Sequence, residues 1–285
     1  MSSPKPSHLD PSDLGTKKYW DEAYEREIDN HAEAPEDEGT IWFSDSGAEE
    51  KMIDFLEEYA DSAQLYKDNS EEHGMQATTF LDLGTGNGHL LFALRDAGWE
   101  GHMVGVDYSA ASIRLARQIG QQRLSASTST RKEGEPVDGD SESTDNAVDH
   151  EHEETGGCNL PVQFEEYDTL NPTPLPHSPQ DGFDVLLDKG TFDAISLSSE
   201  TDTSGRRTCE LYSHCILPLL KPNGIFLITS CNWTEEELRS WFEKETTNDY
   251  KFKFHDRIKY PSFTFGGHKG QSVVTLCFEK TETTS

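Results

Sequence analysis

The chain has 285 residues, of which 33% are hydrophobic, and its formal net charge is −30 at pH 7. This charge disfavours partners with phosphate backbones and favours a basic protein partner, although acidity can also serve solubility alone. The five cysteines include no CxxC pair, which predicts a protein without disulfides or a metal site. No apolar run is long enough to cross a bilayer, so we expect a cytoplasmic protein without membrane segments. We also expect a monomer.

The N-terminal part predicts a tail and two helices in front of the main domain. Trp20, Tyr24 and Ile28 recur at helical spacing with charged residues between them, and a similar apolar face begins a few residues after Trp42. The predicted segments are a disordered tail (1–15), a helix over 16–29, a helix over 46–66, and a helical lid or cap spanning 16–77 as part of one domain over 16–285.

From residue 78 onwards, short apolar runs alternate with helical patterns, which indicates βαβ units and a parallel sheet. Nothing between the last two runs could supply a crossover helix, so they should pair antiparallel. The fold class is therefore α/β: a doubly wound, Rossmann-like, mostly parallel sheet of seven strands with the last one antiparallel. The expected strands are 78–83, 102–106, 161–166, 183–188, 225–229, 251–259 and 271–279, and the expected helices are 89–97, 109–120, 207–220 and 234–245, the last opened by a Thr234–Glu237 capping box.

An acidic insertion interrupts this alternation. Between Glu133 and Glu154 the chain has ten acidic residues and no lysine or arginine. Such a segment buries too little apolar surface to offset the entropy of ordering it. We therefore predict a disordered insertion over 121–159.

The strongest functional signal is a glycine-rich turn, LDLGTGNGH, where a predicted strand becomes a helix. Gly84, Gly86 and Gly88 lack side chains, so a ligand can lie against the backbone and the helix N-terminus. Asp107 ends the next strand, where a carboxylate can accept both hydroxyls of a ribose. Together these features predict a nucleoside ligand.

The spacing of the glycines narrows the choice of nucleoside. GxGxG differs from the GxGxxG of dinucleotide sites, which weakens NAD, and no GxxxxGK[ST] motif is present for a P-loop nucleotide. S-adenosyl-L-methionine remains. Asp82, within the motif, would then face the methionine end and hold its amino group.

The chain resembles the class I, or seven-β-strand, methyltransferases. More closely, it is similar to the eukaryotic lysine methyltransferases that modify translation elongation factor 1-alpha. The resemblance covers about residues 14–120 and 160–280, and Ser44 departs from the glycine expected after Trp42-Phe43. The segments that carry the resemblance are Tyr19-Trp20-Asp21, Trp42-Phe43, Leu81–Gly88, Asp188–Ile195 and Ser230–Thr234.

The resemblance implies a role for each matching residue. Asp168, beside Tyr167, would accept from the adenine amino group, and Asp188 would orient the acceptor ammonium. Trp20 and Trp42 would belong to a lid over the cofactor, although core packing explains them equally well. The implied cofactor contacts are Trp20, Asp82, Gly84, Gly86, Gly88, Asp107, Tyr167 and Asp168, the catalytic residues are Asp188 and Asn232, and the substrate contacts are Trp42 and Trp233.

The implied activity is transfer of a methyl group from S-adenosyl-L-methionine to a protein lysine, with translation elongation factor 1-alpha as the partner. Alignment and desolvation would supply most of the rate acceleration, since charge disperses in the transition state. An RNA or small-molecule acceptor, an NAD-binding Rossmann oxidoreductase and a non-catalytic binding module remain alternatives. The lack of a basic stripe disfavours RNA. A loop cap at Asp168 and helix-entry packing at Trp233 also remain open.

Overall fold

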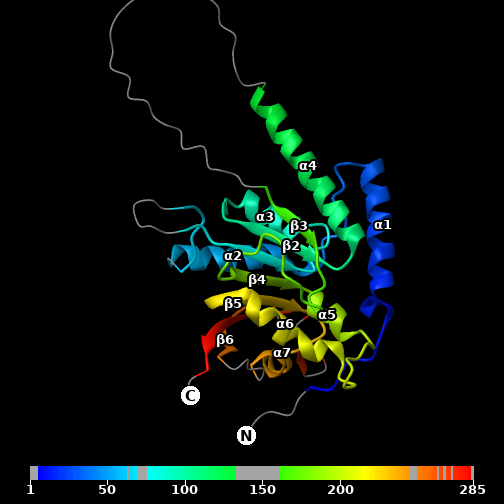
Figure 1. Cartoon of the computed structure of the whole chain (residues 1–285), viewed down its shortest axis with the longest axis vertical. Coiled ribbons are helices and arrows are strands. Elements are labelled where there is room, and N and C mark those ends of the chain that lie inside the picture. The colour runs from blue at the N-terminus through cyan, green and yellow to red at the C-terminus, as the bar shows by residue number, and fades with distance from the viewer. Residues whose placement is uncertain are drawn as a thin grey trace, which may run out of the picture.

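A computed structural model gives the fold for residues 6–62, 64–69, 76–132, 161–243, 249–261, 263–265, 268–270 and 272–283. Its centre is a seven-stranded sheet (Figure 1). Neighbouring strands are parallel except at β9, which runs antiparallel to both of its neighbours. This confirms the predicted strand number and the reversal of the last strand. In sheet order the strands are β3 (Gln163–Glu166), β2 (Met103–Asp107), β1 (Phe80–Leu83), β4 (Phe183–Lys189), β5 (Leu220–Ser230), β9 (Val274–Glu282) and β6 (Tyr250–Ile258).

Helices cover both faces of the sheet, as the doubly wound prediction requires. The central strands β1, β2 and β4 are buried almost throughout, so each face needs an apolar cover. The two apolar layers contain different helices: on one face α2 (Ala48–Asp61), α3 (His89–Asp96) and α4 (Ala110–Lys132), and on the other α5 (Thr191–Ser196), α6 (Tyr212–Ile216) and α7 (Glu235–Phe242).

The register of the parallel strands places the functional turns at one edge. Leu83, the last residue of β1, pairs with Val106 of β2 on one side and with Asp188 of β4 on the other. Because β1, β2 and β4 run parallel, their carboxyl ends meet at the same edge of the sheet. The glycine-rich turn, Asp107 and Asp188 are therefore neighbours.

The N-terminal segment differs from the predicted tail. Residues 6–15 pack on the fold: the Ser12 N–H donates to the Leu197 carbonyl at 3.1 Å, and His8 stacks on Trp241. A short 3-10 helix, η1 (Asp13–Gly15), leads into α1 (Lys17–Glu33), which packs along α4. The Thr16 side chain caps α1 by accepting from the Tyr19 N–H. The polar composition of this segment suggested a tail, but its partners, Leu197 and Trp241, are distant in the chain and could not be identified from the sequence.

Several other boundaries also differ from the prediction. Helix α4 continues to Lys132, so the predicted insertion begins inside a helix, and the rest of it (133–160) lies outside the described residues. Helix α5 was not predicted. The Thr234–Glu237 capping box at α7 is confirmed. Two short 3-10 helices, η3 (Thr208–Leu211) and η4 (Leu217–Leu219), together with α6 replace the single helix predicted over 207–220. The remaining elements are η2 (Ser44–Ser46) and the hairpin of β7 (Phe263–Phe265) and β8 (His268–Gly270).

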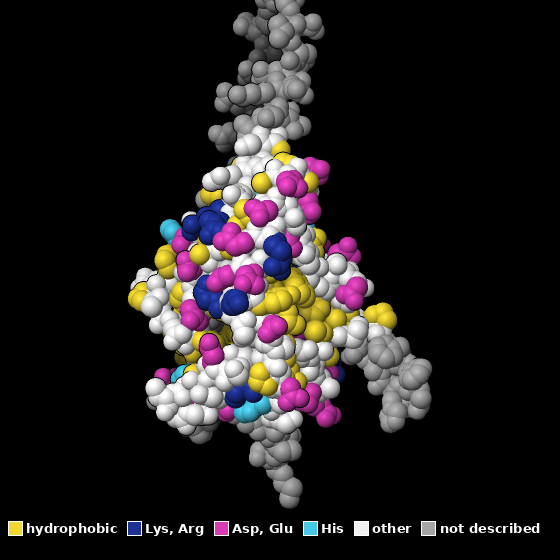
Figure 2. All heavy atoms as spheres, turned by 90° about the vertical axis from the view of Figure 1, so that its right-hand side faces the viewer, with side chains coloured by type: hydrophobic (Ala, Val, Ile, Leu, Met, Phe, Trp, Pro, Cys, Tyr) yellow, Lys and Arg dark blue, Asp and Glu magenta, His cyan; other side chains and the backbone are white. Residues whose placement is uncertain are grey.

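The face that carries α1 shows acidic side chains scattered around a patch of apolar ones (Figure 2). Among the helices of the described residues, none combines the length and the apolar character needed to cross a bilayer.

Candidate active site

The glycine-rich turn is a backbone cradle that other residues could not form. Gly84, Gly86 and Gly88 have φ angles of 68°, 59° and 81°, in the left-handed region that favours glycine. A Cβ at Gly86 would lie 2.6 Å from the Tyr24 hydroxyl, and one at Gly84 would lie 2.1 Å from the Thr191 hydroxyl. The turn therefore requires glycine on two counts, conformation and space.

Asp107 is a buried carboxylate that ties the second strand to this cradle. It accepts a 3.2 Å hydrogen bond from the Gly86 N–H and a 2.8 Å bond from the Ser109 N–H. The Ser112 hydroxyl donates to the Gly86 carbonyl at 2.7 Å, which fixes the turn from its other side. Burial raises the pKa of the Asp107 carboxyl above its usual range. The structure thus brings Asp107 and the glycines together, as predicted.

Asp82 lies beneath the same turn and is 3% exposed. Burial raises the pKa of the Asp82 carboxyl to about 6, opposed by the nearby charge of Lys189 and reinforced by that of Glu49. An ammonium placed against this carboxyl would favour its charged form. The contact of Asp82 with a ligand amino group stays a prediction.

Aromatic side chains from α1 cover the cradle. Tyr24 reaches Gly86, and Trp20 stacks on Tyr24 with ring centroids 6.1 Å apart. The Trp20 indole N–H donates to the Leu14 carbonyl at 2.8 Å, and its ring meets Trp42 edge-on at 5.4 Å. Trp42 is 42% exposed. Trp20 therefore belongs to the cover over the cradle, and Trp42 lies at its outer rim.

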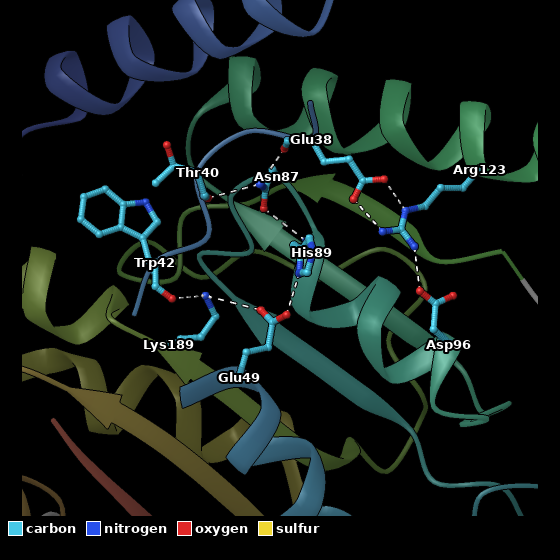
Figure 3. A network of polar contacts seen from close by, with 9 residues as sticks. All are labelled: Glu38, Thr40, Trp42, Glu49, Asn87, His89, Asp96, Arg123 and Lys189. Atoms are coloured by element: carbon cyan, nitrogen blue, oxygen red, sulfur yellow. Dashed lines mark hydrogen bonds and ion pairs between the residues drawn. The ribbon is translucent and has the colours of Figure 1, made fainter. Parts of the chain in front are cut away.

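A polar network joins the segment that follows α1 to the glycine-rich turn (Figure 3). The Asn87 side-chain amide donates to the carbonyls of Glu38 and Thr40, at 2.8 and 3.3 Å. The Glu38 carboxylate in turn forms a bidentate pair with Arg123 of α4, with both contacts at 2.6 Å. The segment between α1 and η2 is therefore bound to both the turn and α4.

The same network contains a charged cluster that sequence reasoning missed. The Glu49 carboxylate of α2 accepts a hydrogen bond from His89 Nδ1 of α3 at 2.6 Å, and its other oxygen lies 3.7 Å from the Lys189 ammonium. Lys189 also donates to the Trp42 carbonyl at 3.1 Å. Lys189 and His89 stand inside motifs already singled out, which was a usable signal. Glu49 is one of many glutamates in the sequence, and only the fold distinguishes it.

The environment of Asp188 differs from the expected one beside the acceptor lysine. It is fully buried, and its oxygens accept from the Thr191 N–H at 2.8 Å and the Tyr212 hydroxyl at 2.7 Å, with a further bond from the Phe192 N–H. Burial raises the pKa of the Asp188 carboxyl to about 7. These contacts hold the start of α5 against the end of β4. A direct contact between Asp188 and an incoming lysine is at odds with this geometry.

The turn after β5 is held by a residue that the sequence reasoning passed over. Asp193 of α5 accepts from the Ser230 hydroxyl at 2.5 Å and from the Cys231 N–H at 2.8 Å. Asn232 is exposed in this turn, as an acceptor-slot residue requires. Trp233 is instead 4% exposed and packs against Phe192 and Trp241, so the alternative of helix-entry packing describes it, and the predicted substrate contact is not supported.

The predicted adenine contacts lie at the end of β3. The Tyr167 N–H donates to the Asp107 carbonyl at 2.9 Å, which places this turn beside Asp107, but the Tyr167 ring is buried in the core. Asp168 accepts from the Leu170 N–H at 2.9 Å and from the Asn171 side chain at 2.6 Å. Asp168 therefore acts as a loop cap in this structure, and its adenine contact stays a prediction.

A separate cavity of about 350 Å³ lies between α3, α4 and β3. Phe92, Arg117, Arg123 and Phe164 are among the residues that line it. None of the predicted site residues lines it, so it is distinct from the cradle.

The residues at the cradle fit S-adenosyl-L-methionine. The three glycines give the turn its left-handed backbone, and Asp107 ends the strand beside them. Asp82 supplies a buried carboxyl on the β1 side. An adenosyl group bearing an amino acid needs these features: a ribose acceptor, a close backbone approach and an acceptor for an ammonium.

Comparison with known proteins agrees with this chemistry. A family described as a methyltransferase domain matches residues 75–132. The protein-lysine N-methyltransferase EFM4 of Saccharomyces cerevisiae is 37% identical over 272 residues, which is 95% of this chain and 96% of that protein. EFM4 of Schizosaccharomyces pombe is 36% identical over 96% of each chain. The human EEF1A lysine methyltransferase 2 is 32% identical over 98% of this chain and 91% of its own length.

Proposed function

The chain belongs to the protein-lysine N-methyltransferase family of EFM4 and EEF1A lysine methyltransferase 2, and from this premise we propose that its own substrate is translation elongation factor 1-alpha. The family resemblance expected from the sequence is confirmed, and so is S-adenosyl-L-methionine as the methyl donor. The full-length similarity to relatives whose names carry this substrate is the single observation that supports the choice. The monomeric state and cytoplasmic location stay predictions.

The charge of the chain supports a basic protein substrate. A net charge of −30 attracts a lysine-rich surface and increases the rate of encounter with it. The exposed Trp42 at the rim offers an apolar contact beside the cradle. A lysine side chain has a long apolar stem and a charged end, so it suits such a rim.

When bound, S-adenosyl-L-methionine supplies the methyl group as a sulfonium. Gly84, Gly86, Asp107 and Asp82 would hold it, and the aromatic cover on α1 would exclude water from this part of the site. Desolvation lowers the pKa of an entering lysine and increases its neutral, nucleophilic fraction. Asn232 is exposed in the turn that Asp193 holds, and we propose that it orients the amine. Asp188 acts by positioning α5.

The test is methylation of purified translation elongation factor 1-alpha. The protein is incubated with labelled S-adenosyl-L-methionine and the elongation factor, and peptides are then mapped by mass spectrometry. We expect label on one lysine, abolished when that lysine is replaced by arginine. A second incubation replaces the elongation factor with a cell lysate. Label that appears there only on RNA, on small molecules or on a different protein would contradict the proposed substrate.

A further inference from the structure

Glu49 has a buried oxygen without a hydrogen-bond partner in the described residues. The residue is 8% exposed, and its Oε1 is bound to His89 Nδ1 at 2.6 Å. Its Oε2 has no hydrogen-bond partner, and the Lys189 ammonium lies 3.7 Å away, beyond hydrogen-bond reach. Leaving a buried carboxylate oxygen unbound costs free energy, so such an atom indicates a missing partner.

Lys189 is a nearly buried cation beside this oxygen. Its side chain is 13% exposed, and its Nζ donates to the Trp42 carbonyl at 3.1 Å. An ammonium has three N–H donors, so Lys189 keeps donor capacity beyond this bond. An acceptor without a hydrogen bond and a cation with capacity for another acceptor therefore lie side by side.

The pair lies on the same side of the sheet as Asp82. Along β4, Lys189 follows Val185 and Leu187 on the face that packs against α2 and α3, and Glu49 lies in the first turn of α2. The charges of both Lys189 and Glu49 act on the Asp82 carboxyl. The pair is therefore close to the end of the cradle opposite Asp107.

We propose that Glu49 and Lys189 form the subsite for the α-amino-acid end of the cofactor, with Glu49 Oε2 joining Asp82 as an acceptor for its ammonium and Lys189 donating to its carboxylate. A zwitterion presents one charge of each sign a short distance apart, and this pair presents the complementary charges. The subsite also links the cofactor to the cover, because Lys189 holds the Trp42 carbonyl. The inference depends on the cofactor and is independent of which protein is methylated.

The test compares two ligands that differ only at the amino-acid end. S-adenosylhomocysteine carries this end, whereas 5′-methylthioadenosine has the same nucleoside and sulfur without it. Calorimetry measures the affinity of each for the wild-type protein and for Glu49→Gln and Lys189→Met. Each substitution should weaken S-adenosylhomocysteine about tenfold, the scale of one charged hydrogen bond, and leave 5′-methylthioadenosine unchanged.

Lys221→Met is the matched control. Lys221 also pairs with a carboxylate, Asp184 at 2.8 Å, but at the start of β5 and away from the cradle. It should change neither affinity. Glu49→Gln preserves side-chain volume, so the test remains available if Lys189→Met does not fold.

If the substitutions weaken the affinity for both ligands equally, the pair has a purely structural role. If they weaken neither affinity, the pair does not contact the ligand. Either result would overturn the proposed subsite. A wild-type protein that binds neither ligand would overturn the cofactor site as a whole. Normal binding of S-adenosylhomocysteine without methylation of the elongation factor would count against the proposed substrate and leave the subsite standing.

Discussion

The Asp193 carboxylate accepts a 2.8 Å hydrogen bond from the Cys231 N–H, which joins the helix after β4 to the turn after β5. Asp193→Ala should release this turn and misplace Asn232, which lies next in it. We expect kcat for methylation to fall about tenfold while the affinity for S-adenosylhomocysteine stays within about twofold, since a small misplacement affects alignment more than binding. Steady-state kinetics and calorimetry separate the two quantities. An unchanged kcat would remove Asp193 from the positioning role.

Gly86→Ala should damage cofactor binding through Tyr24. The alanine would have to adopt a φ of 59°, and its Cβ would lie 2.6 Å from the Tyr24 hydroxyl. We expect at least a tenfold loss of affinity for S-adenosylhomocysteine, measured by calorimetry.

Two further variants isolate the cause of that loss. Gly98→Ala has a similar φ of 88° but no atom within 4 Å of the new Cβ, so it should leave the affinity unchanged. Tyr24→Phe removes the crowding hydroxyl, and combined with Gly86→Ala it should restore part of the affinity. No recovery in the double variant would show that backbone strain alone is responsible.

The affinity for S-adenosylhomocysteine should fall in acid because of Asp82. Burial raises the pKa of this carboxyl to about 6 in the free protein. A bound ammonium favours the charged form, so the ligand lowers this pKa, and below pH 6 binding must release a proton. The affinity should then decrease by up to about tenfold per pH unit below 6 and be flat above 7. Titrations from pH 5 to 8 test this, and Asp82→Asn should give a weaker but flatter profile.

Asp188→Ala should destabilise the fold. The substitution leaves the Tyr212 hydroxyl and two backbone N–H groups without their acceptor, at a cost of roughly 3 kcal/mol in the free energy of unfolding. Denaturant titration measures it, with Asp96→Ala, whose side chain is 68% exposed, as the control.

The pH dependence of that difference has a definite sign. The pKa of Asp188 is about 7 in the folded protein, above the value of about 3.9 of an unfolded chain. Its contribution to stability is therefore fully present below about pH 4 and is lost as the pH rises through 7. The gap between wild type and Asp188→Ala should be larger at pH 5 than at pH 8. A gap that widens towards pH 8 would contradict the raised pKa.

Trp42→Ala should raise KM for the protein substrate about fivefold, because the variant loses an exposed apolar contact at the rim of the cradle. Leu124, on α4, is the other large apolar side chain in the described residues that is strongly exposed, at 53% against 42% for Trp42. Leu124→Ala should leave KM unchanged. Equal effects of the two variants would indicate that surface hydrophobicity in general, and not this rim, binds the substrate.

The sequence by itself determined the fold class and the cradle. The alternation of apolar runs and helices encodes a parallel sheet, since each strand buries both faces. GxGxG followed by Asp107 places a ligand site at the strand ends, because glycine and a strand-end acid leave local signatures. The family resemblance rested on segments that are contiguous in the chain.

The tertiary structure alone decided which polar residues lie at the cradle and which support the fold. Asp188 and Trp233 stand in motifs, yet packing from α5, α6 and α7 buries them. Glu49 and Asp193 have ordinary sequence surroundings, and they matter because strands and helices distant in the chain bring Lys189, His89 and Cys231 to them. Burial and hydrogen bonding depend on these long-range contacts, which residue spacing does not encode.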